Sequence, residues 1–598
     1  MNYDTLYGGA LMDIFSILTL IGGLAIFLYG MDMMGDSLKK LAGSKLESFL
    51  ASLTSTKTRG FLLGLVVTAI IQSSSATSVM LVGFVNSGIM KLSQTISILM
   101  GSNIGTTVTA WILSLTGIEG DSSIFLKLLK PDSFTPILAL IGVIMIMASS
   151  SDRKKNIGSI LIGFSLIIFG MDMMSSMDAD AFSDVLIKFS NPLMAILIGT
   201  IVTAVLQSSS ASVGILQALS LTCAIPYSVA IPIILGQNIG TTITPVLSAL
   251  TGNTSSKRVA AAAVYIKIIG VVVVSVAFYV LDAIFDFPIM DQNVSILTIA
   301  IVHTLFNILS TFILLPFTKQ IVWITKKTIR RKPGEADDEV DIFSTLDDRF
   351  LSMPSFAVEK CRELVYDMSN ITKQSVLKGI DVLYNYNKAT YKEIIDTEGV
   401  IDRYEDKTGS YLAKIASRDL SAKDSLEVNR LLHVVGDIER ISDHSVNIAN
   451  AAKEMDDKNI SFSKYAEDDV KVITDAVNEI ITITIDAFVN NDYELAKKVE
   501  PLDGVIDKLK YKIKDNHIQR LREGGCTVEL GFVLSDLLIT YERIAGHCSN
   551  IAVSLLEPEM DTLETHDYFS HIKSEVDNEY IQEYKKYKEK YSLNSSKK

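Results

Sequence analysis

Long apolar stretches recur throughout residues 1–325 and constrain the fold more than any other feature. Most of them approach the roughly 20 residues that a helix needs to cross the hydrocarbon layer of a bilayer. The unbroken stretches cover residues 11–31, 94–116, 134–149, 157–174, 227–250, 259–281 and 295–325. Because a spanning segment must satisfy its own backbone hydrogen bonds, helices are expected. The sequence therefore predicts an all-α, polytopic membrane domain over residues 1–325.

Two further apolar stretches, 61–90 and 191–224, are interrupted in the middle by polar residues. Each apolar arm has only about a dozen residues, which is short for a span. Irregular backbone at membrane depth is tolerated where protein or a watery cavity surrounds it. We therefore expect two re-entrant helical hairpins instead of two more crossings.

Positive charge predicts the orientation of this domain. Basic residues cluster at 39–59, 153–155, 257–258 and 326–332. With seven spans, two hairpins and the N-terminus outside, every cluster falls on the cytoplasmic side. The first apolar run begins at Leu11 without a basic region before it, so it is expected to be a retained span. A multi-pass protein of the inner cell membrane with a cytoplasmic C-terminal part is predicted.

The same part of the chain contains an internal repeat. Gln-Ser-Ser-Ser-Ala occurs at 72–76 and 207–211, and Asn-Ile-Gly-Thr-Thr occurs at 103–107 and 238–242, so both motifs return at the same offset. Two copies, at about 11–149 and 157–281, each contain three spans and one hairpin, and the span 295–325 lies outside them. An odd number of crossings inverts the second copy, which is a common plan of secondary transporters.

The hairpin tips carry amide and hydroxyl groups and no formal charge. A helix break frees backbone N–H groups, and a half-helix N-terminus suits an oxyanion such as phosphate. Freed carbonyls and hydroxyls suit Na⁺. No Lys or Arg lies within or directly beside these motifs, and co-bound cations are one way to neutralise a dianion at the midplane. Such small residues can also serve only helix packing, but two matched copies favour a binding site.

These paired motifs resemble those of the type II sodium–phosphate cotransporters, bacterial members in particular, over about residues 10–325. The resemblance implies Na⁺-driven import of inorganic phosphate. It implies phosphate binding at the hairpin tips by Gln72, Ser73, Ser74, Ser75, Gln207, Ser208, Ser209 and Ser210. It implies binding of the coupling sodium by Gln207, Ser208, Asn238, Thr241 and Thr242, which we extend to the first-copy residues Asn103, Thr106 and Thr107.

Two ionisable residues lie inside predicted spans. Lys267, in the span 259–281, could extend towards the cytoplasmic surface or face an anion in the pathway. Extension to the surface is favoured, because lysine side chains commonly reach the interface in this way. His303, in the last span, is expected to be a hydrogen-bonded packing residue.

The rest of the chain differs sharply in composition. Residues 1–325 contain 16 basic and 16 acidic side chains, so the net charge of −13 lies beyond them. An acidic surface argues against nucleic acid as a partner. Residues 326–352, with Pro333-Gly334, are predicted to be a linker. Helical apolar spacing over 353–557 predicts a bundle, and 558–598 is a tail that ends in a frayed helix or disorder.

The bundle also repeats. Glu439-Arg440-Ile441-Ser442-Asp443-His444 matches Glu542-Arg543-Ile544-Ala545-Gly546-His547, and the length of chain between the two matches fits three helices per copy. The pattern resembles the PhoU domain, a tandem of three-helix bundles. The resemblance implies a regulatory role and a divalent or iron metal held by acidic residues, here Asp437, Glu439, Asp443 and Glu542.

The second copy has Gly546 where the first has Asp443, which argues against a symmetric metal site. A solvated face of Glu–Arg pairs is slightly favoured instead. A homodimer and a cytoplasmic phosphate-signalling partner both stay open.

An enzyme fits the sequence poorly. We find no P-loop, Gly-x-Ser-x-Gly, His-Glu-x-x-His or Rossmann fingerprint. The four cysteines have no Cys-x-x-Cys spacing and are expected to be reduced thiols. Two alternative functions stay open: a symporter for another oxyanion, and a channel-like or receptor membrane protein that signals phosphate status.

Overall fold

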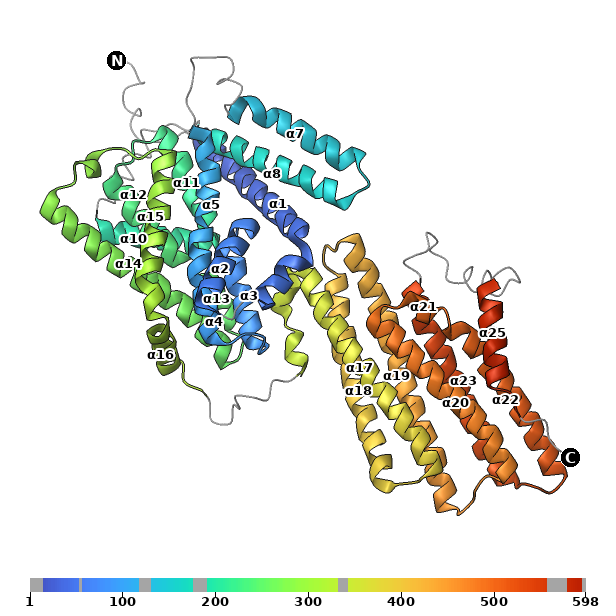
Figure 1. The fold of residues 1–598 in the computed structure, drawn as a ribbon. Coiled ribbons are helices and arrows are strands. Elements are labelled where there is room, and N and C mark those ends of the chain that lie inside the picture. Colours follow the sequence, from blue (N-terminus) through green and yellow to red (C-terminus); the bar gives the residue numbers. More distant parts are fainter. Residues whose placement is uncertain are drawn as a thin grey trace. The chain divides into compact units, whose positions relative to one another are not determined.

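The computed structural model describes residues 14–52, 56–117, 131–175, 191–331, 342–556 and 578–593. The chain forms two compact units, Met1–Ser352 and Met353–Lys598, here called the N-terminal and C-terminal units. Within the described ranges every regular element is a helix, and the one extended contact is an isolated bridge between Pro226 and Asn293. The all-α prediction is confirmed (Figure 1).

The N-terminal unit contains long helices that are interrupted by short breaks. Its α-helices are α1 (Ile14–Ser52), α2 (Lys57–Ile71), α3 (Ser74–Asn86), α4 (Leu92–Gly105), α5 (Thr107–Ser114), α7 (Pro131–Ala148), α8 (Asp152–Ser175), α10 (Pro192–Leu206), α11 (Ser209–Thr222), α12 (Tyr227–Gly240), α13 (Ile243–Ala249), α14 (Thr254–Phe285), α15 (Ile296–Leu314) and α16 (Thr318–Thr328). Short 3₁₀ turns are η2 (Leu115–Gly117), η3 (Pro288–Asp291), η4 (Leu315–Phe317), η5 (Ile342–Thr345) and η6 (Asp348–Ser352).

Six stretches of this unit are long and apolar enough to cross a membrane. They are Leu18–Leu41, Leu92–Gly117, Asp152–Ser175, Tyr227–Ala249, Thr254–Phe285 and Ile296–Thr328. These correspond to six of the seven predicted spans. The seventh, 134–149, is α7, which counts among the shorter apolar helices. The predicted outer loops around 118–130 and 176–190 lie outside the described residues.

Equivalent helices of the two repeats pack against each other in opposite directions. A Cβ on Gly30 of α1 would lie 2.7 Å from the carbonyl oxygen of Gly163 of α8, and a Cβ on Gly170 would lie 2.7 Å from that of Gly23. As the numbers rise along α1 they fall along α8, so the helices are antiparallel. They lie side by side in Figure 1. The repeat is therefore inverted at this pair.

Each repeat also contains a helix–break–helix element packed on the following helix. In the first copy α2, the break and α3 precede α4, and in the second α10, the break and α11 precede α12. The contact of α2 with α4 has no room for side chains, because a Cβ on Gly64 or Gly101 would overlap the backbone carbonyl of Ile98 or Phe61. Gly199 and Gly236 hold the same positions between α10 and α12. Glycine allows this close backbone approach.

Residues 342–352 form a docked segment that was predicted to be the end of a linker. Phe350 is fully buried, and its ring centroid lies 5.4 Å from that of Phe84 in α3. Asp347 accepts a hydrogen bond from the Asn86 side chain at 2.7 Å, and Arg349 donates to the carbonyl oxygen of Ser248 at 3.1 Å. The segment thus contacts both repeats. Of the rest of the predicted linker, residues 326–328 form the end of α16, and residues 332–341 lie outside the described residues.

The C-terminal unit is a bundle of long amphipathic helices. They are α17 (Pro354–Tyr384), α18 (Lys388–Ala416), α19 (Ala422–Asp457), α20 (Lys464–Asn490), α21 (Tyr493–Ala496), α22 (Val499–Arg522), α23 (Val528–Leu556) and α25 (Asn578–Lys590). Fully buried Val, Leu and Ile side chains along α19, α20 and α23 form the core. The first three helices and α20, α22 and α23 provide three long helices for each half of the sequence repeat.

Part of the predicted tail is a docked helix. In α25 and just beyond it, Tyr587 and Tyr591 are buried, and Lys590 pairs with Glu479 of α20 at 2.7 Å. This favours the helical alternative for that part of the tail. Residues 557–577 and 594–598 of the tail lie outside the described residues.

Candidate functional site

The two helix breaks have the same backbone geometry. Gln72 ends α2 with φ 58°, and Gln207 ends α10 with φ 56°, both in the left-handed region. Ser73 and Ser208 then cap the next helices, and their hydroxyls accept hydrogen bonds from the N–H groups of Ala76 at 3.1 Å and Ala211 at 3.2 Å. A serine at this position satisfies one of the free N–H groups of a helix start. The Gln-Ser-Ser-Ser motif therefore encodes the end of one helix and the start of another.

Buried hydroxyl pairs brace each break at matching positions. Thr68 and Thr77 pair through their Oγ1 atoms at 3.0 Å, and Thr203 donates to Ser212 Oγ at 2.8 Å. The two pairs hold equivalent places in the two copies, and all four side chains are buried. Such contacts fix the angle between the two helices of each element.

The two breaks touch each other. Ser75 Oγ donates to the backbone carbonyl oxygen of Gln207 at 3.2 Å. Thr109 of α5 connects them a second time, because it donates to Gln72 Oε1 at 2.7 Å and accepts from Ser210 Oγ at 3.3 Å. The structure thus brings together four of the residues predicted to bind phosphate. Thr109 lies two residues past the first Asn-Ile-Gly-Thr-Thr motif, and Thr244 holds the matching position in the second copy, so the repeat could have singled it out.

A small cavity opens beside the start of α3. Its volume is about 20 Å³, which is room for about one water-sized species. Polar residues from both repeats line it: Ser74, Ser75 and Ser78 of α3, Asn103 of α4, Thr241 and Thr242 at the break between α12 and α13, and Lys267 of α14. The N-terminus of α3, with its free N–H groups and positive dipole end, therefore lies next to hydroxyl, amide and ammonium groups.

The predicted sodium-binding residues divide between the cavity and other positions. Asn103, Thr241 and Thr242 line the cavity, while the hydroxyls of Thr106 and Thr107 bond to carbonyls of their own helix turn. Gln207 and Ser208 lie at the second break. Gln72, Ser73, Ser208, Ser209 and Ser210 are not among the residues that line this cavity.

Lys267 contributes a positive charge that the sequence motifs lack. Its ammonium donates to Asn238 Oδ1 at 2.9 Å and lines the cavity. The favoured prediction, in which Lys267 extends to a membrane surface, is wrong, because a partner inside the protein holds the side-chain end. His303 is buried as predicted, but its Nδ1 has no hydrogen-bond partner within the described residues.

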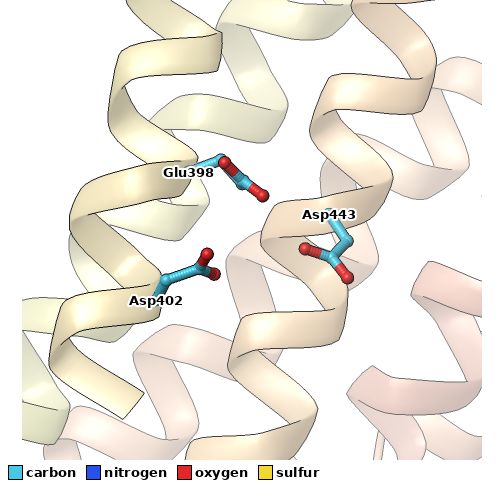
Figure 2. A group of neighbouring side chains, drawn as sticks. All are labelled: Glu398, Asp402 and Asp443. Atoms are coloured by element: carbon cyan, nitrogen blue, oxygen red, sulfur yellow. The ribbon is translucent and has the colours of Figure 1, made fainter. Parts of the chain in front are cut away.

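In the C-terminal unit, three carboxylates converge. Oxygen atoms of Glu398, Asp402 and Asp443 all lie within 4.8 Å of one another, and Figure 2 shows these side chains from α18 and α19 pointing towards the same space. Burial, followed by the neighbouring charge of Asp402, raises the pKa of Glu398 and of Asp443. An all-oxygen donor set suits hard cations.

The other three predicted metal ligands have different contacts. Asp437 accepts hydrogen bonds from His547 Nδ1 at 2.8 Å and Asn550 Nδ2 at 3.1 Å. Glu542 pairs with Lys510. Glu439 lies near Arg440 at 3.5 Å, and burial followed by the charge of Asp443 raises its pKa. The four predicted ligands thus do not converge as a group.

Glu398 and Asp402 were missed although their spacing was informative. They lie four residues apart on α18, as Glu439 and Asp443 do on α19. Carboxylates at this spacing share one helix face. The sequence could not show which face of α18 meets α19.

Fold and site together define a polytopic helical membrane protein with an inverted internal repeat and a separate helical-bundle unit. A model of the Na⁺/Pi-cotransporter family matches residues 26–176 and 177–299, and a PhoU domain model matches residues 365–452 and 470–555. The chain belongs to the Na⁺/Pi-cotransporter family, and its C-terminal unit carries a PhoU domain.

Relatives extend over both units. The chain is 22% identical over 558 residues to "Putative inorganic phosphate export protein YjbB" of Salmonella typhimurium. This match covers 91% of this chain and 98% of that protein. It is 31% identical over 298 residues to "Uncharacterized protein YqeW" of Bacillus subtilis, covering 49% of this chain and 91% of that protein. A shorter match, 35% identical over 99 residues, is to "Sodium-dependent phosphate transport protein 2A" of Rattus norvegicus, covering 16% of this chain and 15% of that protein.

Proposed function

We propose that this chain is a sodium-coupled symporter that imports inorganic phosphate across the inner membrane. The observation that carries the proposal is the contact between the two uncharged helix breaks, through Ser75 and Gln207, beside a polar cavity. In this proposal both helix–break–helix elements are re-entrant hairpins that enter from opposite sides. The N-terminus lies outside, and the C-terminal unit lies in the cytoplasm.

The chemistry of the site gives a reason for coupling. Phosphate would accept hydrogen bonds from the free N–H groups at the start of α3 and from the hydroxyls of Ser74 and Ser75. Sodium would bind to side-chain and carbonyl oxygens such as the amide oxygen of Asn103. Because an unpaired anion at the membrane midplane is costly, each ion favours binding of the other.

The direction of transport follows from the ion gradients. One relative is named as a phosphate export protein. A symporter moves phosphate in the direction that the combined gradients favour, so an inward sodium gradient drives import. A carrier that exports in the cell would need a different driving force, for instance a high internal phosphate concentration.

The test is uptake of labelled phosphate into proteoliposomes that contain the full chain. We expect accumulation against the phosphate gradient when sodium is higher outside, and none when potassium replaces sodium. Gln72→Ala and Gln207→Ala are expected to lower uptake at least about tenfold, whereas Gln320→Ala, an exposed residue of α16, leaves it unchanged. Uptake that is unaffected by sodium would reject the coupling.

Assays with the same proteoliposomes distinguish two alternative functions from phosphate symport. Hydroxyls and backbone N–H groups distinguish poorly between tetrahedral anions, so sulfate or arsenate that competes equally with phosphate would indicate a broader oxyanion symporter. A channel-like or receptor protein would equilibrate phosphate without accumulating it.

We further propose that the C-terminal unit regulates uptake, as its PhoU domain favours. Glu398, Asp402 and Asp443 would hold a divalent cation there. Metal analysis of the purified full chain tests this, with Asp443→Asn as the variant expected to lose bound metal and Asp515→Asn, an exposed residue of α22, as the control.

A further inference from the structure

Lys267 lies in the middle of a membrane-length helix. Its helix α14 starts at Thr254 and ends at Phe285, so several turns lie on either side of the lysine. At about 1.5 Å per residue, Lys267 is about 20 Å or more from either end. Burying an ionisable residue at such a depth in a membrane is energetically costly. Residues of this kind therefore commonly mark an ion or substrate pathway.

The ammonium has no carboxylate partner among the described residues. Ion pairs described in the N-terminal unit, such as Lys39 with Asp36 and Arg349 with Asp347, do not involve Lys267. Lys267 instead donates to the neutral amide oxygen of Asn238, whose own Nδ2 donates to the carbonyl oxygen of Ile234 at 3.0 Å. Its charge is therefore not neutralised by the protein around it.

The two repeats differ at this point. Asn103 and Asn238 hold equivalent positions in the two copies. Among the described residues, only Asn238 accepts a hydrogen bond from an ammonium group through its side-chain oxygen. The side chain of Asn103 lines the same cavity and makes no hydrogen bond within the described residues. At the offset that relates the two copies of each motif, the first copy has Asp132 where the second has Lys267. The sequence thus supplies a fixed cation to one copy alone.

We propose that Lys267 is a built-in cation: it takes the place of a coupling sodium at the second Asn-Ile-Gly-Thr-Thr segment and faces the phosphate held at the start of α3. This deepens the proposed function and rests on it. Sodium then binds at the first segment, where the amide of Asn103 faces the same cavity. Lysine is suited to this role because its ammonium is a compact, strongly hydrogen-bonding point charge.

The proposal predicts a change in sodium dependence and not only a loss of activity. A neutral side chain at position 267 leaves the oxygen of Asn238 to a mobile cation. Phosphate uptake by Lys267→Met should then be about tenfold lower at low sodium and should recover at high sodium. The curve of uptake against sodium concentration should be steeper than that of the wild-type chain, because one more sodium ion is bound per phosphate.

The experiment measures uptake of labelled phosphate by the full chain in proteoliposomes over a series of sodium concentrations. Lys267→Gln also removes the charge, and its side chain is one bond shorter, so it should leave the oxygen of Asn238 to a cation and behave like Lys267→Met. Lys267→Arg keeps the charge and should retain the wild-type steepness. Lys257→Met, on the same helix but exposed, is the matched control and should match the wild type.

Each outcome decides the proposal. Unchanged sodium dependence in both neutral variants, or uptake that is equally reduced at every sodium concentration, overturns it while the symporter function stands. If Lys267→Met does not assemble, Lys267→Gln gives the result on its own. A wild-type chain that accumulates no phosphate with sodium rejects the symporter function, and the role of Lys267 falls with it.

Discussion

Gln72 and Gln207 occupy a backbone conformation that glutamine rarely adopts. Their φ values of 58° and 56° place a Cβ in the left-handed region, which costs about 1 kcal/mol relative to glycine. A side-chain function explains why glutamine stands there. Because glycine does not have this backbone cost, the free energy of unfolding of Gln72→Gly should be about 1 kcal/mol higher than that of Gln72→Ala. Both variants should lose phosphate uptake, because both lack the amide.

Thermal unfolding of the detergent-solubilised full chain, together with uptake, measures these two effects separately. Gln72→Asn is a useful control, because asparagine tolerates the left-handed region and keeps an amide. Wild-type uptake by the glycine variant would show that the amide of Gln72 is dispensable.

Thr109 joins the two breaks from a position just past the first Asn-Ile-Gly-Thr-Thr motif. Thr109→Val keeps the shape of the buried side chain but removes hydrogen bonds to Gln72 and Ser210, and should cost about 1–2 kcal/mol of stability. Its uptake should fall further than that of Thr95→Val, a buried control whose hydroxyl bonds only within α4. Equal uptake by the two variants would contradict a bridging role for Thr109.

At this scale the sequence predicted the polar breaks but not their partners. A repeated Gln-Ser-Ser-Ser motif in an apolar context marks a break by itself. The contacts of Thr109 and Lys267 depend on which faces of α5 and α14 turn inward. Both helices are apolar nearly all round, so periodicity does not indicate an inward face.

Among the elements, the packing of α2 on α4 and of α10 on α12 depends on glycine. Gly101→Ala should push α4 away from α2, because the new methyl group would overlap the backbone of Phe61, and overpacking of this kind costs about 1–3 kcal/mol. Gly236→Ala should have the same effect in the second copy.

Gly35→Ala is the matched control for these glycine variants, since its Cβ would meet only the carbonyl oxygen of Ile71 at 3.7 Å. Thermal unfolding of the full chain in detergent is the measurement. A melting temperature of Gly101→Ala that equals that of Gly35→Ala would contradict the close packing.

The docked segment 342–352 is an element that the sequence did not predict. Its charges resemble those of a linker. Its apolar anchor is Phe350, which packs beside Gly83, where a Cβ would lie 2.8 Å from the ring, and Leu351 is buried as well. The segment has five apolar residues among its eleven, but their spacing does not show which surface they pack against. The six long spans, by contrast, were predictable, because length and apolar composition are sufficient to identify them.

Release of this segment is a testable consequence of losing its anchor. Phe350→Ala should make residues 342–352 at least about tenfold more sensitive to proteolysis in the full chain, since burial of a phenylalanine contributes about 1.5–3 kcal/mol. Ile342→Ala removes an exposed side chain of the same segment and should change nothing. Equal cleavage rates in the two variants would show that Phe350 does not hold the segment.

For the whole molecule, the acidic group of the C-terminal unit makes stability depend on pH. The folded-state pKa values of Glu398 and Asp443 are raised, so the folded protein binds protons more tightly than the unfolded chain. Without metal, the contribution of these two groups to stability is therefore fully present below the ordinary carboxyl pKa values and is lost as pH rises through the raised ones. Glu398→Gln should raise the free energy of unfolding at neutral pH by less than about 1 kcal/mol, because the group is partly exposed to solvent.

Unfolding of the full chain measured from about pH 4 to about pH 8 checks this expectation, with the exposed Asp515→Asn as the control. A bound divalent cation should reverse the sign, since Glu398→Gln then removes a ligand. If Glu398→Gln is less stable than the wild type at neutral pH in the presence of a chelator, repulsion among the three carboxylates is contradicted.

The docked segment has a mechanical consequence for the molecule. Asn86 at the end of α3 is held by Asp347 and also accepts a hydrogen bond from the backbone N–H of Asn253 at 3.1 Å, next to the start of α14. A shift of the first helix–break–helix element against the second repeat would have to strain or break these bonds. The C-terminal unit begins directly after the segment ends, so the chain enters that unit from a segment that is bonded to both repeats, and not from the end of α16.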